Sequence, residues 1–171
     1  MAKKNTIQGF KKVIDNLNKE VKKIKGRTLK GLIEGAIIIR RDMEVTPPVI
    51  PIDLGNLRAS WFTVTAQSEQ GGAPEFKGVE AARLSSGHDV AVSEAKALAQ
   101  TIKDPVVVMG FSANYAMAVH ENVDADFTSP RKRRGKIITR RSGAGAKFFE
   151  KSLQRNTDAV LQVIAKNAQI R

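Results

Sequence analysis

The chain has 171 residues, enough for one domain with a sizeable core, and we predict a single domain over residues 1–171. It has no cysteine, which excludes disulfides and thiolate metal sites and fits a reducing cytoplasm. No apolar run reaches the length of a membrane span, so we expect no membrane partner. The net charge of +12 is uneven, because residues 1–41 hold twelve Lys and Arg against three acids, whereas residues 42–126 hold five against twelve. Basic flanks around an acidic middle permit head-to-tail contact between copies.

Residues 6–41 are predicted to form one long helix. Apolar residues recur at spacings of three and four and form one stripe, while lysines fill the opposite face. The stripe of the first half consists of Ile7, Phe10, Ile14, Leu17, Val21 and Ile24. Residues 32–39 are apolar on most sides, so we expect the second half to be buried, with a candidate kink at Gly26 and an end before Pro47. The pattern favours an ordinary core helix; the alternative is that its lysine face meets DNA or an acidic partner.

Residues 46–66 are predicted to contain a turn followed by a strand. Prolines favour an extended start, and the residues Asp53–Asn56 have turn chemistry. The strand is expected over residues 57–66, with Phe62 and Val64 on one face.

Residues 67–103 are predicted to be a polar loop followed by a partly helical segment. Two glycines and several polar residues make residues 67–77 typical of a loop or a hairpin tip. Apolar residues then recur at helical spacing within residues 78–103. His88 lies in a Ser-Ser-Gly-His-Asp run, which predicts a loop.

Residues 105–121 are predicted to be a buried strand that leads into a short helical turn. The β-branched run Val106–Met109 suits a strand, and Gly110 is expected to end it. His120 and Glu121 close the segment and resemble an acid–base pair, but a histidine that caps a helical turn or bonds a neighbouring strand is favoured. The sequence carries no metal-ligand spacing, phosphate-binding loop or activated-serine motif, so no catalytic residue, no metal and no cofactor are predicted.

The residues 122–144 are predicted to be a mobile basic loop or a poorly paired hairpin around Ile137 and Ile138. The candidate contact residues in this loop are Arg131, Lys132, Arg133, Arg134, Lys136, Arg140 and Arg141. They suit either the phosphates of DNA or an acidic protein neighbour. The segment lacks the interleaved aromatic residues that stack single-stranded bases.

A last helix is predicted over residues 146–169. Its apolar and small residues keep helical spacing and predict one buried stripe. The stripe consists of Phe149, Leu153, Asn156, Val160, Ile164 and Asn167.

Three stretches of the chain together resemble a known family. They are Asp53–Ser60 preceded by Thr46-Pro47, Gly110 followed by Tyr115-Ala116 and His120-Glu121, and Gly145–Phe149 with Leu153. In this order the stretches resemble the motifs of the tail-completion and head–tail joining proteins of tailed bacteriophages, the HK97 gp10-like family. The residues that match these motifs are Asp53, Gly55, Leu57, Arg58, Ser60, Gly110, Tyr115, His120, Glu121 and Phe149.

The resemblance implies an α+β fold, in which a long N-terminal helix and a C-terminal helix pack on a small, mostly antiparallel sheet. It implies a non-enzymatic virion protein of the phage neck, assembled in the bacterial host cytoplasm as a homo-oligomeric ring, a hexamer or a dodecamer. Its partners would be portal or head-completion proteins and tail proteins, with a possible contact to packaged DNA, and the matched residues would be structural. The alternative is a basic nucleic-acid-binding protein that uses residues 1–41 and 131–141.

Overall fold

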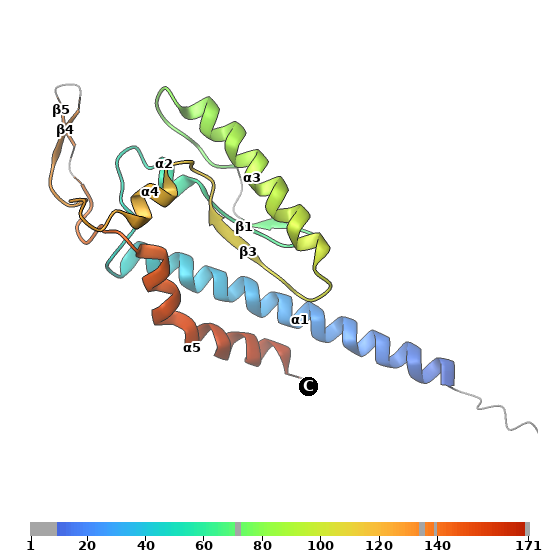
Figure 1. Ribbon diagram of the computed structural model, residues 1–171. Helices are drawn as coiled ribbons and strands as arrows, with labels where there is room; N and C mark the ends of the chain where they lie inside the picture. The colour runs from blue at the N-terminus through green and yellow to red at the C-terminus, as the bar shows by residue number, and fades with distance from the viewer. Residues whose placement is uncertain (1–9, 71–72, 134–135, 139, 170–171) are drawn as a thin grey trace, which may run out of the picture.

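The computed structural model describes residues 10–70, 73–133, 136–138 and 140–169. Its fold is α+β, as predicted: long N-terminal and C-terminal helices accompany a small antiparallel sheet (Figure 1). The elements are α1 (Phe10–Val45), α2 (Asn56–Ala59), β1 (Trp61–Val64), β2 (Glu69–Gln70), α3 (Ala81–Thr101), β3 (Val108–Phe111), α4 (Ala116–Glu121), β4 (Arg131–Arg133), β5 (Lys136–Ile138) and α5 (Phe148–Ala168).

The central sheet has the strand order β2-β1-β3 and is antiparallel throughout. Phe62 and Val64 are buried against α3, where they pack with Val92 and Ala95. Trp61 belongs to the cluster on the other side, which also contains buried residues of α1 and α5. The predicted alternation of faces is therefore confirmed, and the sheet separates α3 from the pair of long helices (Figure 1).

The helix α1 is continuous and shows no break at Gly26. Its second half is the buried half, as expected, with Ala36, Ile39 and Met43 in the core. In its first half Ile14, Leu17 and Val21 of the predicted stripe are exposed and Ile24 is half-buried, so the favoured prediction of an ordinary core helix is wrong for the exposed part of that half. The predicted residues 6–9, with Ile7, lie outside the described residues.

The start of the first strand differs from the prediction, because residues 56–59 form the helical turn α2. Gly55 adopts φ +88°, a left-handed conformation open to glycine, and turns the chain into α2. The Asn56 amide then exchanges two hydrogen bonds with the backbone of Lys77, each 2.8 Å long. This contact, between residues 21 positions apart, holds the start of α2 in place.

Two further local predictions are wrong. His88 lies within α3 and is 3% exposed, because the apolar face of that helix covers the sheet. Gly110 does not end its strand but pairs with Phe62 inside the sheet, where the Phe62 ring lies 3.4 Å from the position of an added Cβ. Strand β3 accordingly starts at Val108 and continues to Phe111.

The basic segment contains a two-stranded hairpin, which confirms the second of the two predicted alternatives. Strands β4 and β5 pair antiparallel, with Lys132 opposite Ile137 and Arg133 opposite Lys136. The helix α5 follows, and most of the predicted stripe faces α1, since Val160 and Ile164 lie against Gly35 and Gly31. The stripe differs near its start, where Phe148 and Ser152 are the buried residues. Leu153 is correspondingly exposed.

Candidate functional site

The basic residues predicted as contacts divide into two groups. Four of them lie on the hairpin β4–β5, which stands apart from the body of the molecule in Figure 1. They are Arg131, Lys132, Arg133 and Lys136, and Arg134 lies outside the described residues. In the backbone register of the hairpin, Arg133 is the partner of Lys136. A two-stranded hairpin is marginal by itself, so an anionic neighbour would stabilise this one.

Arg140 and Arg141 instead make contacts at the base of the basic segment, and Arg141 binds the body of the protein. The Arg140 guanidinium donates to the carbonyl of Asp126. The Arg141 guanidinium donates to the Glu44 carboxylate at 2.7 Å and to the Glu44 carbonyl at the end of α1. These two arginines therefore anchor the base of the basic segment rather than extend from it.

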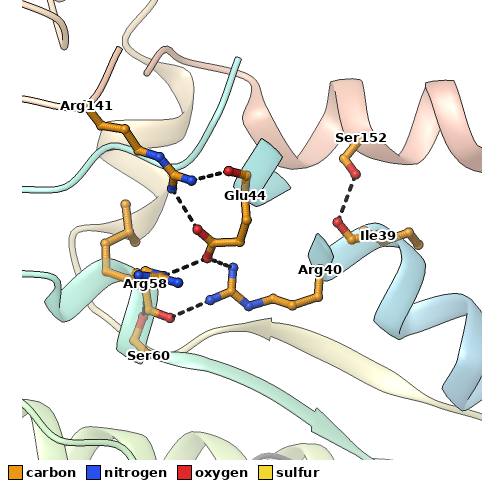
Figure 2. Close-up of polar contacts among 8 residues, drawn as sticks. Ile39, Arg40, Glu44, Arg58, Ser60, Arg141 and Ser152 are labelled. Atoms are coloured by element: carbon orange, nitrogen blue, oxygen red, sulfur yellow. Dashed lines mark hydrogen bonds and ion pairs between the residues drawn. The ribbon is translucent and has the colours of Figure 1, made fainter. Parts of the chain in front are cut away.

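Glu44 is the centre of an ion-pair cluster that joins three parts of the chain (Figure 2). Its carboxylate binds Arg40 of α1, Arg58 of α2 and Arg141. Arg40 also donates to the carbonyl of Arg58 at 3.2 Å. Burial opposes ionisation of Glu44, but the three arginines outweigh it and hold the pKa of Glu44 below its usual value. The cluster contains one acid and three bases and thus keeps a surplus of positive charge.

The first family-like motif, Asp53–Ser60, is a structural corner. Leu57 is buried in the main core cluster. The Ser60 hydroxyl is buried and donates to the carbonyl of Leu57 at 2.8 Å. Arg58 supplies the link to Glu44 at 2.8 Å. The motif thereby fixes α2 against the end of α1.

Asp53 and Tyr115 meet at a cavity of about 370 Å³. Burial and the nearby Asp53 charge raise the pKa of Tyr115 above its usual value. Tyr115 is the residue before α4 and is 37% exposed. The residues around this cavity include Asp53, Leu54, Gly55, Tyr115, Val119 and Arg140. It brings together the first two motifs and the base of the basic segment.

His120 caps the N-terminus of α5. Its Nε2 accepts a hydrogen bond from the Glu150 backbone N–H at 3.3 Å, which satisfies one of the amides left without a partner at a helix start. Its Nδ1 is 2.7 Å from the Glu121 carboxylate. The ring also packs edge-on against Phe148, with centroids 5.0 Å apart. The predicted capping role is confirmed, although the capped helix is α5 and not the turn that contains His120.

An ion-pair network surrounds this cap. Lys147, the residue before α5, binds Glu121 and lies 3.1 Å from Glu150. The hydrogen bond from Lys147, and then that from His120, lower the pKa of Glu121. Glu121 in turn raises the pKa of Lys147. Both residues of the His-Glu pair are thus engaged in holding α5.

Phe149 belongs to the packing between the sheet and α5, whereas Gly110 lies beside Phe62 on the face of the sheet toward α3. Phe149 meets Trp61 edge-to-face at 5.7 Å, and Phe111 meets Phe148 in the same way at 5.5 Å. Such contacts stabilise the core beyond the area that they bury. The third motif therefore packs on Trp61 and Phe111, the residues that directly follow Ser60 and Gly110 of the first two motifs.

A buried histidine–serine pair was missed by sequence reasoning. His88 Nδ1 lies 2.8 Å from the Ser112 hydroxyl, which donates to the carbonyl of Ser60 at 3.2 Å. Ser112 Oγ thus lies between the His88 ring and the Ser60 carbonyl, within hydrogen-bonding distance of both. The pair joins His88 of α3 to Ser112, the residue that follows β3. The only sign of this pair in the sequence is that His88 falls on the apolar face of a helix.

No helix in the described ranges is long and apolar enough to cross a membrane. Within the same ranges, no group of three His, Asp or Glu residues is placed to hold a metal ion. Comparisons of the chain with family models, curated proteins and solved structures give no match. The resemblance to head–tail joining proteins rests on the motifs of this chain.

Proposed function

We propose that this protein is a structural component of a bacteriophage neck, in which it joins the portal connector of the head to the tail as one subunit of an oligomeric ring. In this proposal it is assembled in the host cytoplasm and becomes part of the virion. Its partners are further copies of itself, the portal or head-completion proteins and the tail proteins.

The hairpin β4–β5 is the observation that carries this proposal. It extends from the body in Figure 1, and its two strands contain four basic residues. Its base is joined to the end of α1 by Arg141, which binds Glu44, and is closed on itself by Arg140, which donates to the carbonyl of Asp126. A projecting basic hairpin on such a base suits insertion against an acidic surface of the adjacent ring.

The roles of the motif residues support the same proposal. Ser60 is buried and Leu57 is in the core, while Arg58 and His120 link helices to one another. Residues that fix the mutual positions of secondary-structure elements are what a rigid subunit of a ring requires. His120 caps α5, and Glu121 binds His120 and Lys147, so both residues help to hold that helix in place.

The second candidate is a basic nucleic-acid-binding protein. It is favoured by the net charge of +12 and by the exposed lysines on the first half of α1. Phosphate contacts would make binding steeply dependent on salt and independent of sequence. Tight binding of the isolated protein to duplex DNA, lost as salt rises, would therefore favour this candidate over the neck.

The proposal is tested by electron microscopy of particles from a phage that lacks this gene. We expect full heads and separate tails that fail to join. Complementation with the wild-type gene should restore joined particles. Normally joined virions without the protein would overturn the proposal.

The role of the hairpin is tested by complementation with a variant in which Arg131, Lys132, Arg133 and Lys136 are replaced by Ser. The anchoring residues Arg140 and Arg141 stay unchanged. A matched control replaces four lysines of α1, Lys12, Lys19, Lys22 and Lys23, and so removes the same charge elsewhere. We expect the hairpin variant to fold with an unchanged Tm but to join heads and tails poorly, and the control to join them normally. Equal impairment by both variants would show that charge alone matters.

A further inference from the structure

The first half of α1 presents an apolar stripe that its own chain leaves exposed. We call residues 10–24 the arm. Leu17 is 60% exposed, and Val13, Ile14 and Val21 are exposed as well. The arm continues beyond the C-terminal end of α5 in Figure 1. Helices in water owe most of their stability to the packing of such a face, so we expect a partner to cover the stripe of the arm.

The stripe of the arm continues the seam along which α5 packs on α1. Gly31 lies against Ile164, Gly35 against Val160, and Ile39 accepts a hydrogen bond from Ser152. The numbers rise along α1 and fall along α5, so the two helices are antiparallel. At 3.6 residues per turn, Leu17 and Val21 lie on the same side of α1 as Gly31 and Gly35. A partner on the arm would therefore occupy the line on which α5 ends at Ala168.

We propose that the partner is the arm of a second copy, packed antiparallel about a two-fold axis at Leu17. An antiparallel helix in this position continues the arrangement that α5 already has on α1. Val13 and Val21 are each four residues from Leu17, so a two-fold rotation places Val13 of one copy beside Val21 of the other. The apolar positions thus cover one another in both copies.

The charges of the arm permit this pairing. Lys12, Lys19 and Lys23 lie on the side of the helix opposite the stripe, by the same helical spacing. They remain in solvent when the stripes meet, so the dimer brings no lysines together at its centre. Lys25, just beyond the arm, is engaged with the carbonyl of Lys103 and with Asp104.

The arm contact is separate from the contacts that build a ring. A two-fold contact uses the same patch on both copies and closes after two subunits, whereas a ring needs two different patches. A ring whose head side and tail side differ contains no such two-fold axis, so the arm dimer is a state of the free protein that separates before the ring forms. The inference therefore goes beyond the proposed function. It also holds or fails in purified protein, independently of any result on head–tail joining.

Sedimentation equilibrium of the full chain tests the dimer. We expect a concentration-dependent dimer, and we expect Leu17→Lys to raise its Kd by roughly tenfold or more, because it brings two charges together at the axis. The matched control is Leu161→Lys, which alters a leucine of α5 that is 58% exposed, and it should leave the Kd unchanged. A monomer at every concentration, or an equal effect of the two variants, would overturn the proposal. Binding of anionic phosphatidylserine vesicles by a protein that stays monomeric would assign the stripe to a membrane surface instead.

Single cysteines test the antiparallel register, since the natural chain has none. A disulfide needs Cα atoms within about 7 Å of each other. We expect Leu17→Cys to link to itself under mild oxidation, Val13→Cys to link to Val21→Cys in a mixture, and Lys19→Cys on the far side to stay unlinked. Efficient self-linking of Val13→Cys would show a parallel pair and overturn the register.

Discussion

The two halves of α1 share one helix and one apolar stripe, yet only one half is packed. In the second half Met43 is fully buried and Ile39 is 3% exposed. In the first half Leu17 and Val21 face solvent. The difference therefore lies in what covers each half and not in the pattern of the helix itself.

Glycine distinguishes the covered half. An added Cβ at Gly31 would lie 2.8 Å from the Cα of Ile164, so the backbones of α1 and α5 approach each other there as only glycine allows. Gly26, near the end of the exposed half, has nothing within 4 Å of that position. Periodicity thus determines which face of a helix is apolar, whereas close approach of another backbone determines where that face is buried.

Truncation of one apolar side chain in each half should give the largest contrast. Met43→Ala removes a fully buried side chain, and we expect a loss of about 2–5 kcal/mol in the free energy of unfolding. Leu17→Ala should change it by less than about 0.5 kcal/mol at low protein concentration, where the arms are apart. Urea unfolding of both variants measures the difference. A large loss for Leu17→Ala in dilute protein would mean that the arm packs on its own chain.

The next largest contrast in stability is expected between a carboxylate in each half of α1, Glu44 in the second half and Glu20 in the first. Glu44→Gln leaves three arginines around an uncharged amide, and we expect a loss of about 3 kcal/mol, the low end for a broken buried ion pair because the cluster is partly open to solvent. The pKa of Glu44 is lowered in the folded state, so its stabilisation is present above the usual value of 4.5 and is lost as the pH falls through the lowered pKa. Wild-type stability should thus fall more steeply in acid than that of the variant.

Glu20→Gln is the matched control in the first half of α1. The hydrogen bond from Lys23 lowers the pKa of Glu20 as well, but that pair is exposed and screened by water. Denaturant titrations from pH 7 to pH 3 should give superimposable curves for this variant and the wild type. A flattened acid limb for Glu20→Gln would contradict the assignment of the effect to Glu44.

Much of the fold could be predicted from the sequence, because its signals are local. The end of α1 before Pro47 follows from the backbone restriction that proline imposes. Helical spacing marks α3 and α5, and the alternation of Phe62 and Val64 gives the buried face of β1. Each of these features depends on residues within a few positions of one another.

The features that escaped prediction depend on distant residues. The turn α2 is fixed by Asn56 and Lys77, and Arg141 reaches Glu44 across 97 residues. His88 has loop-like neighbours, but tertiary burial of its helix face overrides them. The sequence identifies the basic residues of the candidate site by their charge. Which of them lie on the hairpin and which, like Arg141, bind the rest of the protein is seen only in the structure.

A methyl group added to each half of α1 should have opposite effects. Gly31→Ala places a Cβ against the backbone of α5, and we expect a loss of about 2 kcal/mol from the strain of overpacking. Gly26→Ala meets open space and should stabilise the helix by up to about 1 kcal/mol, because alanine is the better helix former. Thermal unfolding followed by circular dichroism measures both. Equal shifts in the same direction would show that α5 moves aside at Gly31.

Removal of the cap on α5 should have the smallest effect, and it tests whether the covering helix is held at its start as well as along its seam. His120→Ala leaves the Glu150 amide without its acceptor, and we expect a loss of about 1 kcal/mol, typical of a helix cap. Glu121→Gln keeps the cap but weakens the bond to Lys147. Because that ion pair is exposed, we expect the variant to have the same free energy of unfolding as the wild type. For His120→Ala, the backbone amides in the first turn of α5 should exchange faster. The amides around Val160, which packs against Gly35, should stay protected. Uniformly faster exchange along α5 would mean instead that the cap and the seam unfold as one unit. The packing of α5 on the second half of α1 would then depend on His120 as much as on the glycines of α1.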